Sequence, residues 1–449
     1  MTETDLLIVG AGAKAAAIAT KVHVLNRLGL GPISLKIVEG TEPAASWLGR
    51  NGMTSGEEPL AVTPIKDIGF PYQSHYEFGE AGEAIDAGTM GFSWQQYLIG
   101  ERRYARWIDA GSPSVRHRDY GAYLTWVLGR ATEGVTHVRG RVTEVALDDA
   151  GERWLVAVEE PGGASRHAGG ALVLTGPGIH RAFPHEPSVA DRVFHCDSRR
   201  GEFARLPQDR ACDVAVVGGG ESALSCVMFL RGFRPKARCT VYTPMLPMSR
   251  GESFLENRVF SNPDEVEWGD LDLQTRRDFV KHSDRGVFDP PSLAAIAYDD
   301  RARFVTGRVT DVGAPAAGDG VRLEYESPEG GAGSEHEYVV NCTGFDLLAQ
   351  LRGLFPAPLR AEVERRAGPL WERPAGSEVR IGRGLELEGM SPRLHIPGLG
   401  GLSQGPGFAN LGALGLLSNR VLQPLVREIA PEQGFGGGDN LQYKSLSLE

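Results

Sequence analysis

The sequence predicts an α/β fold with two Rossmann-like dinucleotide-binding domains, the second inserted in the first, and a small, mainly helical substrate region. One pattern, an apolar strand, a glycine-rich turn and a helix that begins with small residues, occurs at 5–15 and again at 213–223. Both strands lack a polar face, which is typical of the centre of a parallel sheet. Two copies argue against a chance match and indicate that the chain binds two dinucleotides.

The first glycine-rich turn has the residues that a pyrophosphate requires. Gly10 makes the tight turn, Gly12 lets the backbone approach the phosphates, and Ala15 allows close packing of helix and strand. Free N–H groups at the start of the helix favour anions. The next strand, 34–38, ends in Glu39, an acid expected to accept hydrogen bonds from a ribose. We expect the first dinucleotide to contact Gly10, Gly12, Ala13, Lys14, Ala15 and Glu39.

The ends of the second strands distinguish the two dinucleotides. Glu39 suits a free 2′-hydroxyl and repels a phosphate, which favours FAD in the first domain. In the second copy the strand ends at Thr243 without an acid, and Arg250 follows, which favours NADPH because arginine can bind a 2′-phosphate with two hydrogen bonds. NADH stays possible, since Arg250 can equally be a solvated surface charge. The expected contacts are Gly218, Gly220, Glu221, Ser222, Thr243 and Arg250.

The segment between the two copies completes the first domain. A turn-rich, aromatic stretch at 46–72 either wraps the reactive ring of a large cofactor, with Trp47 in contact, or forms a surface loop with anchoring aromatic residues. Apolar residues at three- and four-residue intervals predict helices at 92–99, 104–108 and 120–128. Alternating apolar residues predict antiparallel strands at 135–138, 141–147 and 154–159. A buried strand then ends at Thr175 and Gly176, which we expect to contact the cofactor.

An insertion at about 245–292 interrupts the second domain, and it is long enough that we expect it to be functional. Strands are predicted after it at 303–306, 322–326 and 338–342. Residues 346–390 carry little signal, 393–396 is a last short strand, and a glycine-rich turn at 398–408 leads into a helix at 410–421. The further cofactor contacts expected here are Gly344, Phe345, Gly407 and Leu411.

These elements give the domain bounds. The first part of the FAD domain is 1–205, the NADPH domain is 206–345, and 346–430 returns to the FAD domain and the substrate region. The remainder, 431–449, is rich in glycine and polar residues and is expected to be a disordered tail.

The composition excludes several classes of protein. The 449 residues carry a net charge of −11 without a basic stripe, so neither nucleic acid nor an anionic membrane is an expected partner. We find no signal peptide and no apolar run long enough to cross a bilayer, so we expect a cytoplasmic protein, and we expect a homo-oligomer. The five cysteines are scattered and lack Cys-x-x-Cys spacing, so we expect neither disulfides nor a metal site.

Several flavoenzyme families share this plan of two dinucleotide-binding domains. The disulfide reductases need a redox cysteine pair, which is absent here, and the Baeyer–Villiger-type monooxygenases carry Phe-x-Gly-x-x-x-His, whereas segment 192–198 has His195 without that glycine. From the first turn to about Val421 the sequence resembles the siderophore-associated N-hydroxylating flavin monooxygenases of lysine and ornithine, most closely the lysine N6-hydroxylases of mycobactin-type pathways. The resemblance lies in 10–15, 66–67, 69–72, 93–95, 97–99, 107–109, 218–221, 250–252, Phe254, 256–257, 284–288, 401–402 and 404–408.

The resemblance implies that NADPH reduces the flavin, that O₂ forms a C4a-hydroperoxide on it, and that the side-chain amine of L-lysine attacks this oxygen. The free amine has a pKa of about 10.4, so the site must favour its uncharged form. The neutral amide of Asn257 therefore suits the amine as the catalytic contact, and Asp284 is expected near the α-ammonium, with capping or turn chemistry as the alternative for each. Gln96 stands where ornithine enzymes have a lysine for the substrate carboxylate, and Gly412 where they have a serine, which is expected to leave room for one more methylene.

Other functions stay open at this point. They are N-hydroxylation of ornithine or another amine, an NADPH oxidase of the same group, and a flavin-binding module without turnover. Substrate-dependent product formation separates the enzymes, and bound FAD without NADPH oxidation would indicate the module. The sequence does not distinguish free from acylated lysine.

Overall fold

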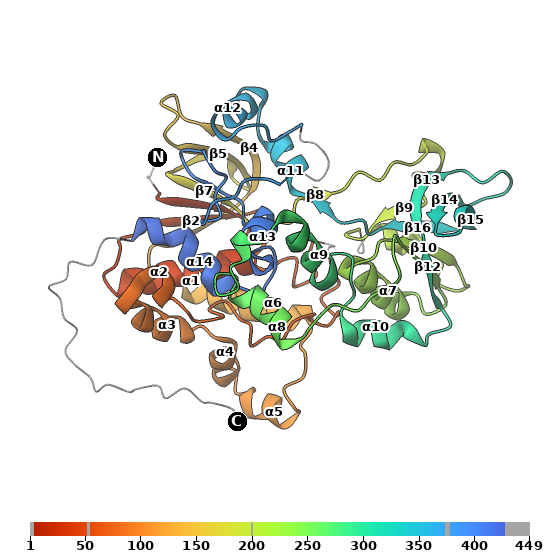
Figure 1. Cartoon of the computed structure of the whole chain (residues 1–449), viewed down its shortest axis with the longest axis horizontal. Coiled ribbons are helices and arrows are strands. Elements are labelled where there is room, and N and C mark those ends of the chain that lie inside the picture. Colours follow the sequence, from red (N-terminus) through yellow and green to blue (C-terminus); the bar gives the residue numbers. More distant parts are fainter. Residues whose placement is uncertain (1–3, 52–53, 199–200, 373–377, 427–449) are drawn as a thin grey trace.

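The computed structural model describes residues 4–51, 54–198, 201–372 and 378–426 and shows two α/β bodies side by side (Figure 1). The larger body holds the N-terminal sheet and most of the helices, and the smaller body, on the right of Figure 1, is the second domain. The tail expected to be disordered, 431–449, lies outside the described residues. Within the described ranges, no helix is both long and apolar enough to span a membrane.

The first domain is built on a five-stranded parallel sheet in the order β18-β7-β1-β2-β3. Its strands are β1 (Leu6–Val9), β2 (Leu35–Glu39), β3 (Val135–Arg139), β7 (Ala171–Leu174) and β18 (Leu394–His395). Helix α1 (Ala13–Arg27) follows the first glycine turn and is buried along most of its length. The prediction that 135–138 is antiparallel is wrong, because this strand pairs in parallel with β2. As the edge strand it has exposed residues, so its alternation reflects one-sided burial and not direction.

A small antiparallel sheet is appended to the first domain. It consists of β4 (Arg141–Leu147), β5 (Trp154–Glu160) and β6 (Gly163–Gly169), which confirms the two predicted strands and adds the third. The low-signal region contains two helices, α11 (Leu347–Leu354) and α12 (Ala357–Ala367). Phe355, directly after α11, packs on Trp154 with ring centroids 6.1 Å apart, so this region covers the small sheet.

The helices between β2 and β3 pack through aromatic side chains. They are α2 (His75–Phe78), η1 (Gly79–Ala81), α3 (Gly82–Met90), α4 (Trp94–Gly100), α5 (Tyr104–Asp109) and α6 (His117–Arg130), and the last three confirm the predicted helices. Tyr123 lies at the centre of the cluster, with ring centroids 5.5 Å from Trp94 and 5.7 Å from Tyr97. These rings are buried core and hold α4 against α6.

The second domain has its own parallel sheet in the order β12-β11-β10-β16-β9. The strands are β9 (Val193–His195), β10 (Asp213–Val217), β11 (Arg238–Thr243), β12 (Ala302–Thr306) and β16 (Tyr338–Asn341). Helix α7 (Glu221–Phe233) follows the second glycine turn. Short helices η2 (Pro187–Val189) and η3 (Glu202–Arg205) precede this turn, and β13 (Arg308–Gly313), β14 (Val321–Ser327) and β15 (Gly330–His336) form an antiparallel sheet.

The border between the domains differs from the predicted position. Strand β9 falls in the range assigned to the first domain, but it pairs with β16 of the second sheet, so the chain enters the second domain before residue 193 and not at 206. The two chain crossings lie next to each other, because β8 (Ile179–His180) pairs with β17 (Phe345–Asp346). A three-residue edge strand carries too little periodicity to be recognised in the sequence.

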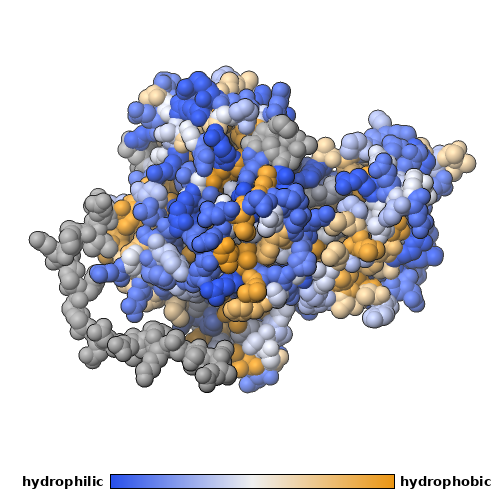
Figure 2. All heavy atoms as spheres, viewed as in Figure 1, coloured by the Kyte–Doolittle hydropathy of each residue, from blue (hydrophilic) through white to orange (hydrophobic). Residues whose placement is uncertain are grey.

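The first three elements of the insertion lie against the first domain, and its last helix packs on α7 of the second domain. Its elements are α8 (Phe254–Ser261), η4 (Trp268–Asp270), α9 (Leu273–Ser283) and α10 (Pro290–Ala297), and α8 and α9 lie against the larger body (Figure 1). Trp268 Nε1 donates a hydrogen bond to Leu402 O (2.9 Å). Figure 2 shows apolar residues gathered at the centre of this face of the larger body. Phe254 and Leu255, on the first turn of α8, are 75% and 70% exposed.

The C-terminal segment returns to the first domain. It contains η5 (Pro397–Leu399), α13 (Gly400–Ser403), η6 (Pro406–Phe408), α14 (Leu414–Leu422) and η7 (Gln423–Leu425). The helix predicted from 410 begins at Leu414, because Asn410 Oδ1 accepts a hydrogen bond from Gly412 N (2.7 Å) and closes a turn. Gly415 N donates to Phe70 O (2.7 Å), so α14 begins against the loop that precedes α2.

Two helical glycines should respond in opposite ways to alanine. A Cβ at Gly415 would lie 2.1 Å from Gly69 O, so Gly415→Ala should lower the free energy of unfolding by about 1–3 kcal/mol through overpacking. A Cβ at Gly129, in α6, would meet no protein atom within 4 Å, so Gly129→Ala should raise it by up to about 1 kcal/mol. Urea unfolding of both variants measures the difference, and equal changes would contradict the close approach of α14 to the loop.

Candidate functional site

The first glycine turn lies at the C-terminal end of β1, where parallel sheets bind ligands. Gly10 has φ +97°, which favours glycine, and a Cβ there would lie 2.6 Å from Thr175 Oγ1. A Cβ at Gly12 would meet no protein atom within 4 Å, so the turn leaves open space before the N-terminus of α1. The first N–H groups of that helix, from Ala13, have no partner within the helix and can bind an anion. This geometry fits the pyrophosphate of FAD.

Glu39, at the end of β2, supports the same turn. One carboxylate oxygen accepts a hydrogen bond from Ala11 N (2.9 Å), and the other accepts from Thr41 N and Thr41 Oγ1 (3.0 Å each). Ala44 N donates to Ala11 O (2.9 Å), which places the segment that carries Trp47 beside the turn. Trp47 packs edge-to-face on two aromatic rings of α6. A ribose contact for Glu39 and a ring contact for Trp47 stay predictions.

Lys14, in the first turn of α1, joins this turn to the C-terminal glycine-rich segment. Its Nζ donates to Ala409 O (2.9 Å). Burial lowers the pKa of Lys14 to about 8, the Arg285 guanidinium acts in the same direction, and the Asp284 carboxylate opposes both. A phosphate group bound nearby would stabilise the charged form of this amine, as expected for a cofactor contact.

The C-terminal glycines allow close packing against α8. A Cβ at Gly407 would lie 2.1 Å from Phe260 O, and a Cβ at Gly412 would lie 3.2 Å from Phe260 Cβ. Leu411 is partly buried and packs against the core of the first domain. Gly412 therefore does not open space for a longer substrate, in contrast to the expectation from the sequence. Helix α8 of the insertion lies against the space that a side chain at residue 412 would occupy.

The second glycine turn resembles the first in geometry. Gly218 has φ +152°, and a Cβ there would lie 2.4 Å from Cys342 O. A Cβ at Gly220 would lie 3.7 Å from Gly286 N, so the loop after α9 lies over this turn. Ser222 belongs to the first turn of α7, and the Thr243 hydroxyl, at the end of β11, donates to a backbone carbonyl two residues later. The turn and the helix N-terminus fit a second dinucleotide.

Glu221 is the first residue of α7, and Arg250 lies close to its carboxylate. Burial raises the pKa of Glu221 to about 8, and the Asp289 carboxylate adds to the effect. Arg250 Nη1 lies 3.6 Å from Glu221 Oε1, its Nε donates to Glu252 Oε1 (3.0 Å), and its Nη2 donates to Ala61 O of the first domain (2.7 Å). The guanidinium thus lies at the pyrophosphate end of the expected NADPH site. Contact with a 2′-phosphate stays a prediction and requires Arg250 to leave these partners.

The structure brings Lys66 and Asn257 together. Lys66 Nζ donates to Asn257 Oδ1 (2.7 Å), while Asn257 Nδ2 donates to Glu252 O (3.0 Å) and Ser253 O (3.2 Å). Burial lowers the pKa of Lys66, and the Arg250 guanidinium adds to the effect. Lys66 was not among the predicted site residues. The sequence signal for Lys66 is its place in the pair 66–67, which resembles the family. That pair does not indicate that Lys66 contacts Asn257.

Two further residues predicted to contact the substrate have other hydrogen-bond partners in the structure, and their contacts with substrate stay predictions. Asp284 Oδ1 accepts a hydrogen bond from Asn410 Nδ2 (2.8 Å), and Asp284 Oδ2 lies 2.9 Å from Arg285 Nε, so its carboxylate joins the loop after α9 to the first domain. Gln96 is exposed on α4, and its backbone N–H donates to Ser93 Oγ (3.3 Å) at the start of that helix. No hydrogen bond among the described residues joins Gln96 to the Lys66–Asn257 pair.

The remaining predicted contacts lie at the two chain crossings. Thr175 Oγ1 donates to Val9 O (2.9 Å), and Gly176 follows it. Gly344 O accepts from Arg181 N (3.0 Å), and Phe345 pairs with the neighbouring strand residue in β8. These residues connect the two domains, and their contacts with a cofactor stay predictions.

A cluster of His180, His195 and Asp197 beside the crossings does not have the geometry of a metal site. The two imidazole rings stack with centroids 3.6 Å apart, so their nitrogen lone pairs do not converge on one point. Asn341 Oδ1 accepts a hydrogen bond from Thr343 N (2.9 Å), which directs Asn341 Nδ2 to His195 Nε2 (2.7 Å). The Asn341 amide thus donates to His195 Nε2, while His195 Nδ1 lies 3.6 Å from Asp197 Oδ1.

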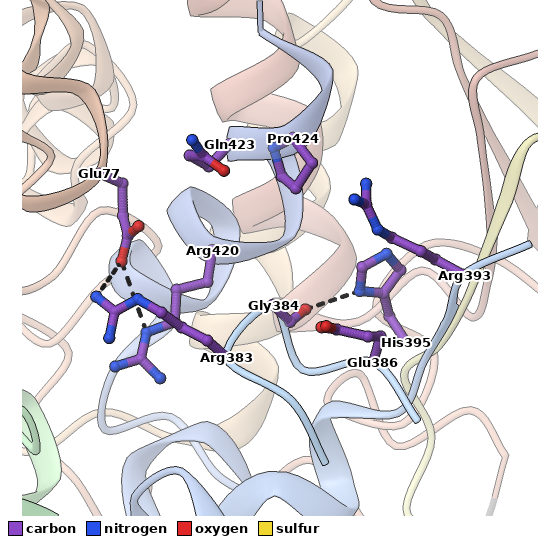
Figure 3. A pocket seen from close by; sticks show the side chains of 9 residues that line it. All are labelled: Glu77, Arg383, Gly384, Glu386, Arg393, His395, Arg420, Gln423 and Pro424. Carbon is purple, nitrogen blue, oxygen red and sulfur yellow. Dashed lines mark hydrogen bonds and ion pairs between the residues drawn. The ribbon is translucent and has the colours of Figure 1, made fainter. Parts of the chain in front are cut away.

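A polar pocket of about 110 Å³ lies at the C-terminal end of α14 (Figure 3). Arg420 Nη2 donates to Asp264 Oδ1 (2.6 Å), and Arg383 Nη2 donates to Glu77 Oε1 (2.7 Å). Arg383 Nη2 also donates to Asp264 Oδ2 (3.0 Å), and because Asp264 follows α8 closely in the chain, its two ion pairs hold the far end of α8 on the first domain. The pocket is lined by Glu77, Arg383, Gly384, Glu386, Arg393, His395, Arg420, Gln423 and Pro424.

Known proteins resemble the chain over nearly its whole length. Residues 85–346 match the model of a family described as L-lysine 6-monooxygenase/L-ornithine 5-monooxygenase. The L-lysine N6-monooxygenase MbtG of Mycolicibacterium paratuberculosis is 37% identical over 433 residues, 93% of this chain and 95% of the relative. MbtG of Mycobacterium tuberculosis H37Rv is 35% identical over 93% of this chain and 94% of the relative.

Solved structures show the same fold. The lysine monooxygenase NbtG from Nocardia farcinica superposes with a TM-score of 0.79 at 33% identity and covers 94% of this chain and 100% of its own. The ornithine N-hydroxylase KtzI from Kutzneria sp. 744 superposes with a TM-score of 0.73 at 17% identity, covering 94% of this chain and 99% of its own. The predicted fold class, with two dinucleotide-binding domains, is confirmed.

Gly12→Val should abolish FAD binding without unfolding the protein. The Cβ of the new side chain would meet no protein atom within 4 Å, and the side chain would enter the space where the pyrophosphate is expected to approach the backbone. Gly100→Val is the matched control, since a Cβ there also meets no atom within 4 Å and α4 lies away from the turn. The ratio of flavin absorbance to protein concentration measures the result. A folded Gly12→Val variant with stoichiometric FAD would contradict FAD binding at the first glycine turn.

Proposed function

This chain belongs to the L-lysine 6-monooxygenase/L-ornithine 5-monooxygenase family, and we propose that it hydroxylates the side-chain nitrogen of L-lysine. It is an FAD- and NADPH-dependent N-hydroxylating monooxygenase, and we infer that its product serves siderophore biosynthesis. Relatives named as lysine N6-monooxygenases at 35–37% identity support lysine over ornithine. The observation that carries the proposal in the structure is the contact between Lys66 and Asn257.

The residues present fit both cofactors. FAD would be held by the first glycine turn, Lys14 and the N-terminus of α1, and NADPH by the second glycine turn and the N-terminus of α7. When bound, NADPH would supply two electrons to FAD, and the reduced FAD would activate O₂, the source of the transferred oxygen atom. The side chains of the site bind the substrate, orient its amine and control the protonation state of that amine.

Lys66 is suited to bind the α-carboxylate of the substrate. Its ammonium is partly buried, next to the neutral amide of Asn257, and burial lowers its pKa. An anion bound beside Lys66 would restore the charged form, because an opposite charge within a few ångströms favours ionisation. We therefore propose Lys66, and not Gln96, as the partner of the carboxylate.

Asn257 is suited to hold the neutral side-chain amine. Its amide nitrogen is fixed by two carbonyl groups of the insertion, which directs Oδ1 into the site as an acceptor. When Oδ1 accepts a hydrogen bond from an N–H of the neutral amine, the nitrogen lone pair stays available for attack on oxygen. A carboxylate in the same place would favour the ammonium form, which cannot attack. We therefore propose Asn257 as the catalytic contact.

Lysine and ornithine should differ in coupling as well as in affinity. One methylene contributes about 1–3 kcal/mol of discrimination, and a shorter chain also moves the amine away from attack distance. We expect close to one hydroxylamine formed per NADPH consumed with L-lysine. With L-ornithine we expect slow NADPH oxidation that yields mainly hydrogen peroxide.

The measurement is hydroxylamine formed against NADPH consumed for each substrate, with norleucine as the control that lacks the amine. Equal coupled turnover of ornithine and lysine would contradict the substrate assignment while leaving the N-hydroxylase class intact. NADPH oxidation without hydroxylamine from any amine would indicate an oxidase of the same fold.

A further inference from the structure

The turn that follows Lys66 is built around one buried carboxylate, Asp67. Asp67 is 1% exposed and accepts hydrogen bonds from Gly69 N (3.1 Å), the Tyr72 hydroxyl (2.8 Å) and Trp94 N (2.9 Å). Two of these donors lie in the turn itself, and the third is the first residue of α4. The carboxylate therefore fixes the shape of the turn and its attachment to the helix at the same time.

The same turn contacts two other parts of the site. Phe70 O accepts a hydrogen bond from Gly415 N (2.7 Å), and a Cβ at Gly415 would lie 2.1 Å from Gly69 O, so the start of α14 packs directly on the turn. Ile68 N donates to the Tyr123 hydroxyl of α6 (3.5 Å). Lys66 is thus the last residue before a turn held by three helices.

We propose that Asp67 is a positioning residue whose ionised carboxylate holds Lys66 in place for the substrate carboxylate. The proposal rests on the proposed function, since it assumes that Lys66 binds the carboxylate of L-lysine. Asp67 contacts neither substrate nor cofactor in this account. It acts through the backbone of the turn, which directs the Lys66 side chain toward Asn257.

Protonation of Asp67 would weaken this arrangement. Two of its three donors are backbone N–H groups, which cannot turn away and are best satisfied by a charged acceptor. Burial raises the pKa of Asp67 to about 6, and the hydrogen bonds to Asp67 oppose the rise. Lysine binding should therefore respond to pH near that value.

The groups that face Asp67 do not titrate near pH 6. They are Tyr72 in the turn and Tyr120 and Tyr123 on α6, and burial raises the pKa of each phenol above its usual range, so all three stay neutral. Lys66 is the adjacent cation in the chain, and Asp86 on α3 lies near Tyr72. The substrate carboxylate, with a pKa near 3.5 or below, stays ionised as well.

Acid should affect substrate affinity and stability in opposite directions through Asp67. A carboxyl whose pKa is higher in the folded than in the unfolded chain adds stability at low pH, and this contribution is lost as pH rises through the folded pKa. Protonation of Asp67 below about pH 6 therefore stabilises the fold while it loosens Lys66. Loss of lysine binding in this range is then not a sign of unfolding.

The test is calorimetric titration of L-lysine into the oxidised, FAD-loaded enzyme between roughly pH 5 and pH 8. For the wild type we expect Kd to rise about tenfold per pH unit below about pH 6 and to level off above it. Asp67→Asn should bind lysine at least about tenfold more weakly at pH 8, with no inflection near pH 6, because the amide presents an N–H to a backbone N–H.

Two further variants make the test specific. Tyr72→Phe removes one donor from the carboxylate and should move the inflection to higher pH, which a merely structural role would not do; it also keeps the proposal testable if Asp67→Asn does not fold. Asp272→Asn removes an exposed carboxylate that caps α9 and should leave the curve unchanged.

An Asp67→Asn enzyme with the wild-type affinity and inflection would overturn the proposal, and so would a Tyr72→Phe curve without a shift. Failure of the proposed function is distinguishable, because the wild type would then form no hydroxylamine from L-lysine at any pH.

Discussion

The proposed substrate site depends on one hydrogen bond between residues far apart in the chain, from Lys66 Nζ to Asn257 Oδ1 (2.7 Å). Lys66 belongs to the first domain, whereas Asn257 belongs to a helix inserted in the second. The contact exists because α8 and α9 of the insertion pack on the first domain, where Trp268 Nε1 donates a hydrogen bond to Leu402 O (2.9 Å). A segment inserted in the second dinucleotide-binding domain therefore contacts the first domain at the proposed reaction site.

Burial shifts the ionisable groups around this site toward their neutral forms. The pKa of Lys14 falls to about 8, and those of Asp67 and Glu221 rise to about 6 and 8. Desolvation is the first cause in each case, because burial disfavours the charged form of an acid or an amine. The charges on these three side chains therefore depend on pH and on bound anions.

The local parts of this architecture could be predicted from the sequence. Gly10, Gly12 and Gly218 were recognised because a phosphate-binding turn imposes its requirements on a few consecutive residues. The helices at 94–100 and 117–130 were found from their periodicity.

The parts that depend on distant contacts were not predicted. Lys66 and Asn257 are 191 residues apart, and only packing of the insertion brings them together. Gly412 was expected to enlarge the substrate site, but Phe260 of α8 takes up that space. The direction of β3 and the sheet to which β9 belongs are likewise set by neighbours that no local pattern specifies.

The most direct test of the central claim is the ratio of kcat/KM for L-lysine to that for 1,5-diaminopentane, which has the same amine but no carboxylate. A charge-assisted contact contributes about 1.5–3 kcal/mol, so the wild type should prefer L-lysine by roughly one to two orders of magnitude. In Lys66→Met the ratio should fall toward one, while Lys281→Met, an exposed lysine on α9, should keep it. An unchanged ratio in Lys66→Met would contradict the role of Lys66 and with it the site described above.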